Sequence, residues 1–314
     1  RDWKKLLKGY YDSPDRAENF VVTGSGRFDL FQRGGDSLQG RYDSYHLWPL
    51  NPDEVGKSGS RATARPRDWI LWQPDSSSES DQALLDFGGF PVPFLDGTRE
   101  RLNKWQDLYL DRLVREDARD FSSVERLDQL ELLGRLLPTR VGSPISYRSI
   151  SEDIEASPIS IKNWMRIFEI IYFGFLIKPF HRKIHRAVKR EPKWYFYQWT
   201  FCEEPGARFE NYLAVQLASA CRLWRDQGYG EWELSYIRDQ DRREVDFVIT
   251  CGMKPMALIE AKASPQGFTA ALHHYAERLK IPAFLVYPSG PTQRIAGKGW
   301  CVSSRLFLKG LWQS

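Results

Sequence analysis

The sequence predicts a mixed α/β fold, in which a helical part precedes an α+β unit, and two patterns support this. From about Pro205 to Ser314, apolar runs of strand length alternate with amphipathic runs of helical length. This alternation predicts a mixed sheet flanked by helices. In the preceding part, from Gly88 to Ile177, apolar side chains recur mainly at the spacing of helices.

Two apolar runs near the end of the chain predict a strand, a tight turn and a second strand. The runs Val245–Thr250 and Met256–Ala263 flank the segment Cys251–Pro255, which has the glycine and the length of a hairpin loop. Helices and strands are expected on both sides of this hairpin. They are a helix over 206–226, a strand over Trp232–Ile237, a helix over Thr269–Leu279 and a strand over Ala283–Tyr287.

Four charged residues of this hairpin are expected to share one face. A turn centred on Met253 places Asp246 opposite Glu260. The same register places Glu244 opposite Lys262, and side chains alternate between faces along a strand. Carboxylates that face each other across a ladder repel, and a divalent cation between them would offset this cost. The other face would hold Val245, Phe247, Ile249, Ala257, Ile259 and Ala261.

This arrangement suggests metal-dependent phosphodiester hydrolysis. Asp246 and Glu260 would bind Mg²⁺ (or Mn²⁺), which would activate water and polarise the phosphate. Lys262 would orient the nucleophile or neutralise developing charge. Glu210, at the edge of a buried helix face and near the helix start, would be an upstream catalytic acid and metal ligand. The alternative is a solvated face on which Glu244 pairs with Lys262 and no metal binds.

The composition limits the class of protein and its compartment. With 314 residues and 42% hydrophobic residues, the chain is long enough for two or three domains. Its net charge of +4 is only mildly basic, so partners must be inferred from local clusters. The most apolar stretch, Trp164–Ile177, is too short to span a membrane. The cysteines lack metal-binding or disulfide spacing, which favours free thiols in the cytoplasm. They are Cys202, Cys221, Cys251 and Cys301.

A linker and two helical units are expected between the ends of the chain. From 51 to 81 the composition shifts to Gly, Ser, Pro and Arg, which predicts a loop or linker. A helical region then begins at Gly88, with a plain helical bundle as the simplest interpretation. The second unit has a short helix from Ser146 to about Glu155, a turn over Ala156–Pro158 and a longer helix. This is the plan of a helix-turn-helix.

The helix-turn-helix and its basic neighbour suggest DNA binding. Lys162 and Arg166 lie on the expected exposed side of the second helix. A basic segment then precedes an aromatic strand at Trp194–Tyr197, which suits a winged helix-turn-helix whose cations contact phosphates. A helical hairpin without nucleic acid, or a basic face that binds protein, is the alternative. The cations of the segment are Arg182, Lys183, Arg186, Lys189 and Arg190.

The chain resembles two known families. Asp246, thirteen residues and Glu260-Ala261-Lys262, after a helix with Glu210, resemble the PD-(D/E)xK restriction-endonuclease-like fold, with Val245 in place of the motif's proline. The N-terminal part resembles the end of a prokaryotic AAA+ ATPase core, with a strand at Phe20–Ser25 followed by Arg27 and the sequence SLQGR. A Rossmann-like strand with a surface loop is the alternative interpretation of this part.

The second resemblance implies an order of domains and a nucleotide. Residues 1–55 would be the remnant of the ATPase core, 56–140 the linker and helical lid or connector, 141–204 the winged helix-turn-helix and 205–314 the nuclease-like domain. Ser25 would contact the γ-phosphate region of ATP, and Arg41 would act as an arginine finger or a phosphate contact. No phosphate-binding G-x-x-x-x-G-K-[ST] motif occurs, so ATP is expected in the full-length protein only. Because the chain begins at Arg1, a fragment is expected, and the family allows a homo-oligomer of the full-length protein.

Three functions follow from these patterns. The first is an ATP-coupled protein that binds DNA and cleaves it with a metal-dependent nuclease site. The second is a non-catalytic DNA-binding module whose nuclease-like fold serves as a platform. The third is a protein-interaction and regulatory module that uses the same surfaces.

Overall fold

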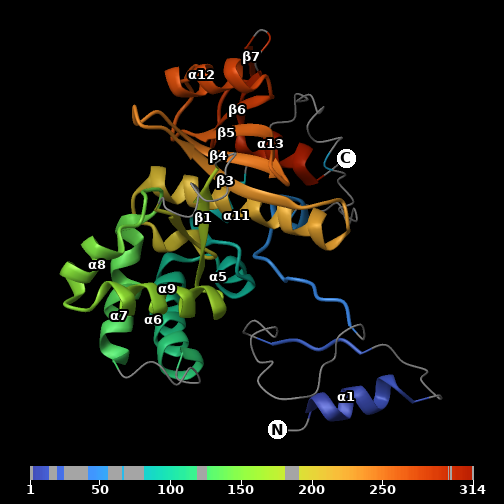
Figure 1. The fold of residues 1–314 in the computed structure, drawn as a ribbon, viewed down its shortest axis with the longest axis vertical. Helices are drawn as coiled ribbons and strands as arrows, with labels where there is room; N and C mark the ends of the chain where they lie inside the picture. Colours follow the sequence, from blue (N-terminus) through green and yellow to red (C-terminus); the bar gives the residue numbers. More distant parts are fainter. Residues whose placement is uncertain are drawn as a thin grey trace.

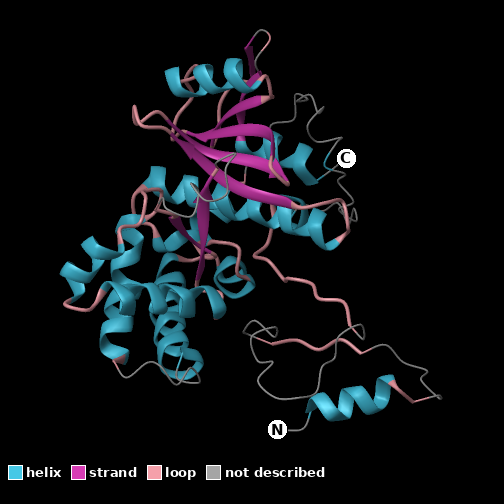
Figure 2. Ribbon diagram, in the orientation of Figure 1, coloured by secondary structure: helices cyan, strands magenta, loops and turns pink. Residues whose placement is uncertain are grey.

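A computed structural model confirms the mixed α/β fold. It describes residues 3–13, 20–24, 42–55, 66, 81–118, 126–180, 191–295, 297 and 299–312. The described strands form one eight-stranded sheet, and helices cover both of its faces (Figures 1 and 2). No described helix has the length and apolar content that crossing a membrane requires.

The sheet is mixed, as the sequence predicts. Its spatial order is β2-β1-β3-β4-β5-β6-β8-β7. Strand β1 is parallel to β3, and β5, β6 and β8 run parallel to one another, whereas the other neighbours are antiparallel. The strands are β1 (Gly174–Pro179), β2 (Lys193–Phe196), β3 (Trp232–Arg238), β4 (Glu244–Cys251), β5 (Lys254–Ala261), β6 (Ala283–Tyr287), β7 (Gln293–Ile295) and β8 (Gly299–Ser303).

Helices α11 (Pro205–Asp226) and α12 (Ala270–Leu279) lie on opposite faces of the sheet (Figure 1). Phe247 and Ile259 belong to the larger core, which includes α11 and α13 (Ser304–Trp312). Val248 and Leu258 belong to a smaller core with α12. Neighbouring buried residues of β4 and β5 thus belong alternately to two apolar layers, one on each face of the sheet. The predicted helices and strands of this region are confirmed.

The helical part forms where the sequence predicts it as far as Ile170, whereas Gly174–Ile177, which were expected to be helical, belong to strand β1. Helix α8 (Tyr147–Ile154) begins after Ser146, and α9 (Pro158–Ile170) begins after Ser157. Each serine accepts a hydrogen bond from a backbone N–H of the first turn, which caps the helix. Other elements are α2 (Pro52–Val55), α4 (Gln82–Phe87), α5 (Pro91–Asp96), α6 (Arg99–Arg112), a π-helical turn (Leu113–Asp117), α7 (Leu127–Leu136), and 3₁₀ turns (Leu137–Arg140 and Trp199–Phe201).

The β1–β2 hairpin joins the helical part to the C-terminal sheet. Strand β2 pairs with β1, and β1 pairs in parallel with β3. The aromatic side chains of β2 are fully buried in the larger core together with Phe168 of α9 and Tyr212 of α11. The β1–β2 hairpin therefore shares one sheet with the C-terminal unit, and α8 and α9 share one core with it.

The N-terminal segment differs from its prediction. Residues 3–11 form a helix, α1 (Trp3–Tyr11). The buried strand predicted over Phe20–Ser25 is wrong for residues 20–24, which form no strand, and Val21 is 90% exposed. In the described part of the chain no sheet strand pairs with this segment, so its apolar side chains have no layer to cover them. Ser25, Arg41 and most of the predicted linker lie outside the described residues.

A buried acid at the start of the helical part accepts hydrogen bonds from the C-terminal unit. The loss of one of these hydrogen bonds should destabilise the fold. Asp81 accepts hydrogen bonds from the hydroxyls of Tyr212 (2.6 Å) and Ser304 (2.9 Å). Tyr212→Phe keeps the ring but leaves the buried carboxylate with fewer donors, which should lower the free energy of unfolding by about 1–3 kcal/mol. Urea denaturation would measure this. Tyr229→Phe, at a more exposed tyrosine, is the control, and equal midpoints for the two variants would contradict the prediction.

Candidate functional site

The β4–β5 hairpin has the register that the sequence predicts at its acidic end. Phe247 pairs with Ile259 and Val248 with Leu258, so the next position places Asp246 opposite Glu260. The register shifts by one residue near the turn, after Ile249. The predicted backbone register, with Asp246 opposite Glu260, is therefore confirmed.

A β-bulge changes where the side chains of β4 point. Between β3 and β4, Ser235 pairs with Val248 and Ile237 with Val245, so two residues of β4 lie opposite Tyr236. A bulge interrupts the alternation of faces and re-aims the side chain at the bulge. Val245 accordingly packs in the smaller core with Val248, and the prediction that it shares a face with Phe247 is wrong.

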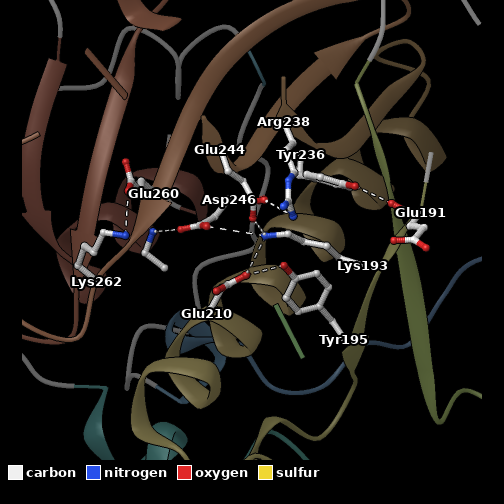
Figure 3. Close-up of polar contacts among 11 residues, drawn as sticks. Glu191, Lys193, Tyr195, Glu210, Tyr236, Arg238, Glu244, Asp246, Glu260 and Lys262 are labelled. Carbon is white, nitrogen blue, oxygen red and sulfur yellow. Dashed lines mark hydrogen bonds and ion pairs between the residues drawn. The ribbon is translucent and has the colours of Figure 1, made fainter. Parts of the chain in front are cut away.

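Asp246 and Glu260 have different partners (Figure 3). The Oε1 atom of Glu260 lies 2.8 Å from Nζ of Lys262, and its Oε2 accepts a hydrogen bond from Thr269, 2.6 Å away, at the start of α12. The Oδ2 atom of Asp246 accepts a hydrogen bond from the backbone N–H of Ala261, 2.9 Å away. Glu260 is thus directed toward α12, whereas the Oδ1 atom of Asp246 approaches Lys193 of β2.

Lys193 lies at the centre of three carboxylates. Its Nζ atom lies 2.5 Å from Oε1 of Glu244, 3.5 Å from Oε1 of Glu210 and 3.9 Å from Oδ1 of Asp246. The side chain is buried, and its ammonium lies 5.2 Å from the centre of the Tyr236 ring. Figure 3 shows the carboxylates of α11 and β4 pointing toward this atom. We call Lys193, Glu210, Glu244 and Asp246 the lysine-centred cluster.

Neighbouring elements hold Glu210 in this cluster. Tyr195 lies two residues after Lys193 on β2 and therefore points to the same side of the strand. Its hydroxyl donates a hydrogen bond of 2.6 Å to Oε1 of Glu210. Gly142 lies against the same carboxylate with a φ of +75°, and a Cβ atom there would lie 2.8 Å from Oε2 of Glu210. This position therefore requires glycine for both its conformation and its space.

Burial and charge set the protonation of the cluster. Burial lowers the pKa of Lys193, but the surrounding carboxylates, Glu210 first, outweigh this and raise the pKa above its usual value. Burial, together with the nearby Glu210 carboxylate, raises the pKa of Asp246 to about 7. Lys193 is therefore a permanent cation, whereas the charge of Asp246 changes near neutral pH.

The carboxylates in this arrangement do not fit a divalent cation. Among the described residues, no group of three His, Cys, Asp or Glu side chains is arranged to hold a metal ion. An ammonium lies where the oxygens of Glu210, Glu244 and Asp246 converge. The cost of facing carboxylates, which suggested a metal, is offset here by Lys193 and Lys262 of the chain itself.

The other predicted site residues lie apart from this cluster. Lys162 and Arg166 are exposed on α9, as predicted. The cations predicted between β1 and β2 lie outside the described residues; they are Arg182, Lys183, Arg186, Lys189 and Arg190. Sequence reasoning missed the roles of Lys193 and Tyr195. The signal was their i, i+2 spacing on a short aromatic strand, which puts both on one face.

Comparisons with known families match three parts of the chain. Residues 1–56 match an AAA domain. Residues 80–199 match a domain of unknown function, DUF8612, and residues 205–307 match another, DUF4143. This combination is consistent with an AAA-family ATPase-like protein. No curated protein and no solved structure matched the chain.

The raised pKa of Asp246 predicts a pH dependence of stability. The folded protein keeps a proton on Asp246 that the unfolded chain, with a pKa near the ordinary 3.8, releases. The free energy of unfolding should therefore fall as pH rises from about 4 to about 7. Asp246→Asn should remove this component, because the amide binds no proton in this range while the groups that face Asp246 are the same in both proteins. These groups are Glu210, Glu244, Lys193 and Lys262.

Urea denaturation of both proteins across this pH range would measure the difference. Asp96→Asn, at an exposed carboxylate on α5, is the control and should leave the pH dependence unchanged. Parallel curves for the parent and Asp246→Asn would contradict a raised pKa at Asp246.

Proposed function

We propose that this chain is the DNA-binding C-terminal part of an AAA-family ATPase-like protein, and that its nuclease-like unit is not catalytic in this arrangement. The observation that carries the proposal is the pair of cations on α9. Lys162 and Arg166 lie one helical turn apart and are both exposed. They project from the second helix of a helix-turn-helix, the element that enters the DNA groove in such proteins.

The packing of α9 supports this role. Ile161, Trp164 and Phe168 face the core, so the opposite side of the helix is left for solvent or a ligand. Asn163 is exposed beside Lys162, which adds a side chain able to form hydrogen bonds with base edges. A rigid helix backed by a core can present such groups in fixed positions.

The order of elements also supports a winged helix. Helices α7, α8 and α9 are followed by the antiparallel pair β1–β2. The sequence between these strands, residues 181–190, carries five Lys and Arg residues and two His residues. A wing at this point of the sequence would add phosphate contacts beside those of α9.

The AAA-domain match at residues 1–56 supports an ATPase-like whole. In this proposal the full-length protein binds ATP, Ser25 contacts the γ-phosphate region and Arg41 contacts a phosphate. Assembly of the full-length protein into a homo-oligomer belongs to the same proposal. The DNA-binding part would then be a module whose position responds to the nucleotide state.

A metal-dependent deoxyribonuclease is the second candidate. The register that places Asp246 opposite Glu260 favours it, as does Lys262 beside Glu260. In this candidate Asp246, Glu260 and Glu210 would bind Mg²⁺ or Mn²⁺. The present partners of these carboxylates favour the non-catalytic module instead.

DNA binding through α9 predicts a salt-dependent affinity. Lys162→Ala/Arg166→Ala should weaken binding to a labelled duplex and make the plot of log affinity against log salt shallower by about two units. Fluorescence anisotropy over a series of NaCl concentrations would measure both quantities. Lys104→Ala/Lys254→Ala removes two exposed cations elsewhere and should leave the slope unchanged. Equal slopes for both double variants would exclude α9 as the DNA-binding element. No DNA binding by the parent would favour the protein-interaction module.

The non-catalytic assignment predicts no specific DNA cleavage. The parent protein, incubated with single- or double-stranded DNA and Mg²⁺ or Mn²⁺, should cleave no faster than Asp246→Asn, because Lys193 occupies the position between the carboxylates. Gel analysis of end-labelled DNA would measure this. Metal-dependent cleavage by the parent that is lost in Asp246→Asn would replace this proposal with the nuclease.

A further inference from the structure

The backbone at Lys193 is held by contacts on both sides. Its backbone pairs with Ile177 of β1 on one side and bridges to Pro144 on the other. The preceding backbone is also fixed, because Ile145 N–H donates to the Pro192 carbonyl and the Tyr236 hydroxyl donates to the Glu191 carbonyl. The backbone that carries Lys193 is therefore fixed, and its buried ammonium lies beside Glu210, Glu244 and Asp246.

The cluster without Lys193 would lack a cation at its centre. Arg238 lies 3.3 Å from Oε2 of Glu244, and Tyr195 donates a hydrogen bond to Glu210. Neither group lies between Glu210 and Asp246, which come from α11 and β4. Even partly buried carboxylates without a counter-charge are costly, and carboxylate oxygens are ligands that suit hard divalent cations.

We infer that Lys193 is the resident cation of this site and excludes a divalent metal ion from the carboxylates of Glu210, Glu244 and Asp246. The three acidic side chains are then the partners of an ammonium group and not of a metal ion. This inference does not require DNA binding, so the two proposals fail separately. It adds a residue from the β1–β2 hairpin to a site otherwise formed by α11 and β4.

The lysine and methionine side chains are similar in length, so Lys193→Met removes the charge with little change in volume. The parent should show no Mn²⁺ binding at this cluster by calorimetry, whereas Lys193→Met should gain one Mn²⁺ site. Adding Asp246→Asn to Lys193→Met should weaken that binding at least about tenfold. Lys178→Met, at an exposed lysine of β1, is the matched control and should behave as the parent does.

A second variant tests the inference if Lys193→Met does not fold without metal. Lys193→Met/Glu244→Gln removes one carboxylate together with the lysine, so fewer charges are left unpaired, and Mn²⁺ should raise its melting temperature. Rescue of either variant by Mn²⁺ supports the inference. It is overturned if neither variant binds Mn²⁺, or if the parent binds Mn²⁺ at these carboxylates with an affinity that Lys193→Met leaves unchanged or weakens.

Discussion

The buried ammonium of Lys193 constrains how three parts of the chain can meet. A buried charge is tolerated only when it is paired and well positioned. Its carboxylate partners come from α11 and β4, while Lys193 itself comes from β2. These elements must therefore assemble together. The β1–β2 hairpin, which follows α9, is in this way linked to the C-terminal unit by ion pairs as well as by backbone pairing.

The same assembly connects the proposed DNA-binding helix to the acidic site. Phe168 of α9 lies 6.4 Å from the ring of Trp194, the residue directly after Lys193. Ile161 and Trp164 are buried in the same core. The exposed face of α9 and the lysine-centred cluster are therefore both supported by one apolar layer. Close packing of such a layer transmits small displacements between its faces.

The β-bulge opposite Tyr236 explains why a nuclease-like pattern yields a different constellation of side chains. A regular ladder would direct Asp246 and Glu260 to one face. With the bulge, Asp246 is close to Lys193, while Glu260 contacts Lys262 and the first turn of α12. Asp246 therefore shares Lys193 with Glu210 and Glu244, whereas Glu260 pairs with Lys262. The spacing of acidic residues alone does not distinguish these outcomes.

Local sequence patterns predict most helices and strands of the C-terminal unit and the register at the acidic end of the β4–β5 hairpin. Periodicity located α11, α12, β3 and β6, and serine caps located α8 and α9, because these signals act within a few residues. The hairpin pattern also fixed Asp246 opposite Glu260. The partner of each carboxylate, in contrast, depends on how distant segments pack together. Lys193 precedes Asp246 by 53 positions, and its place depends on a bulge and on strand pairings between distant segments, which no local pattern encodes.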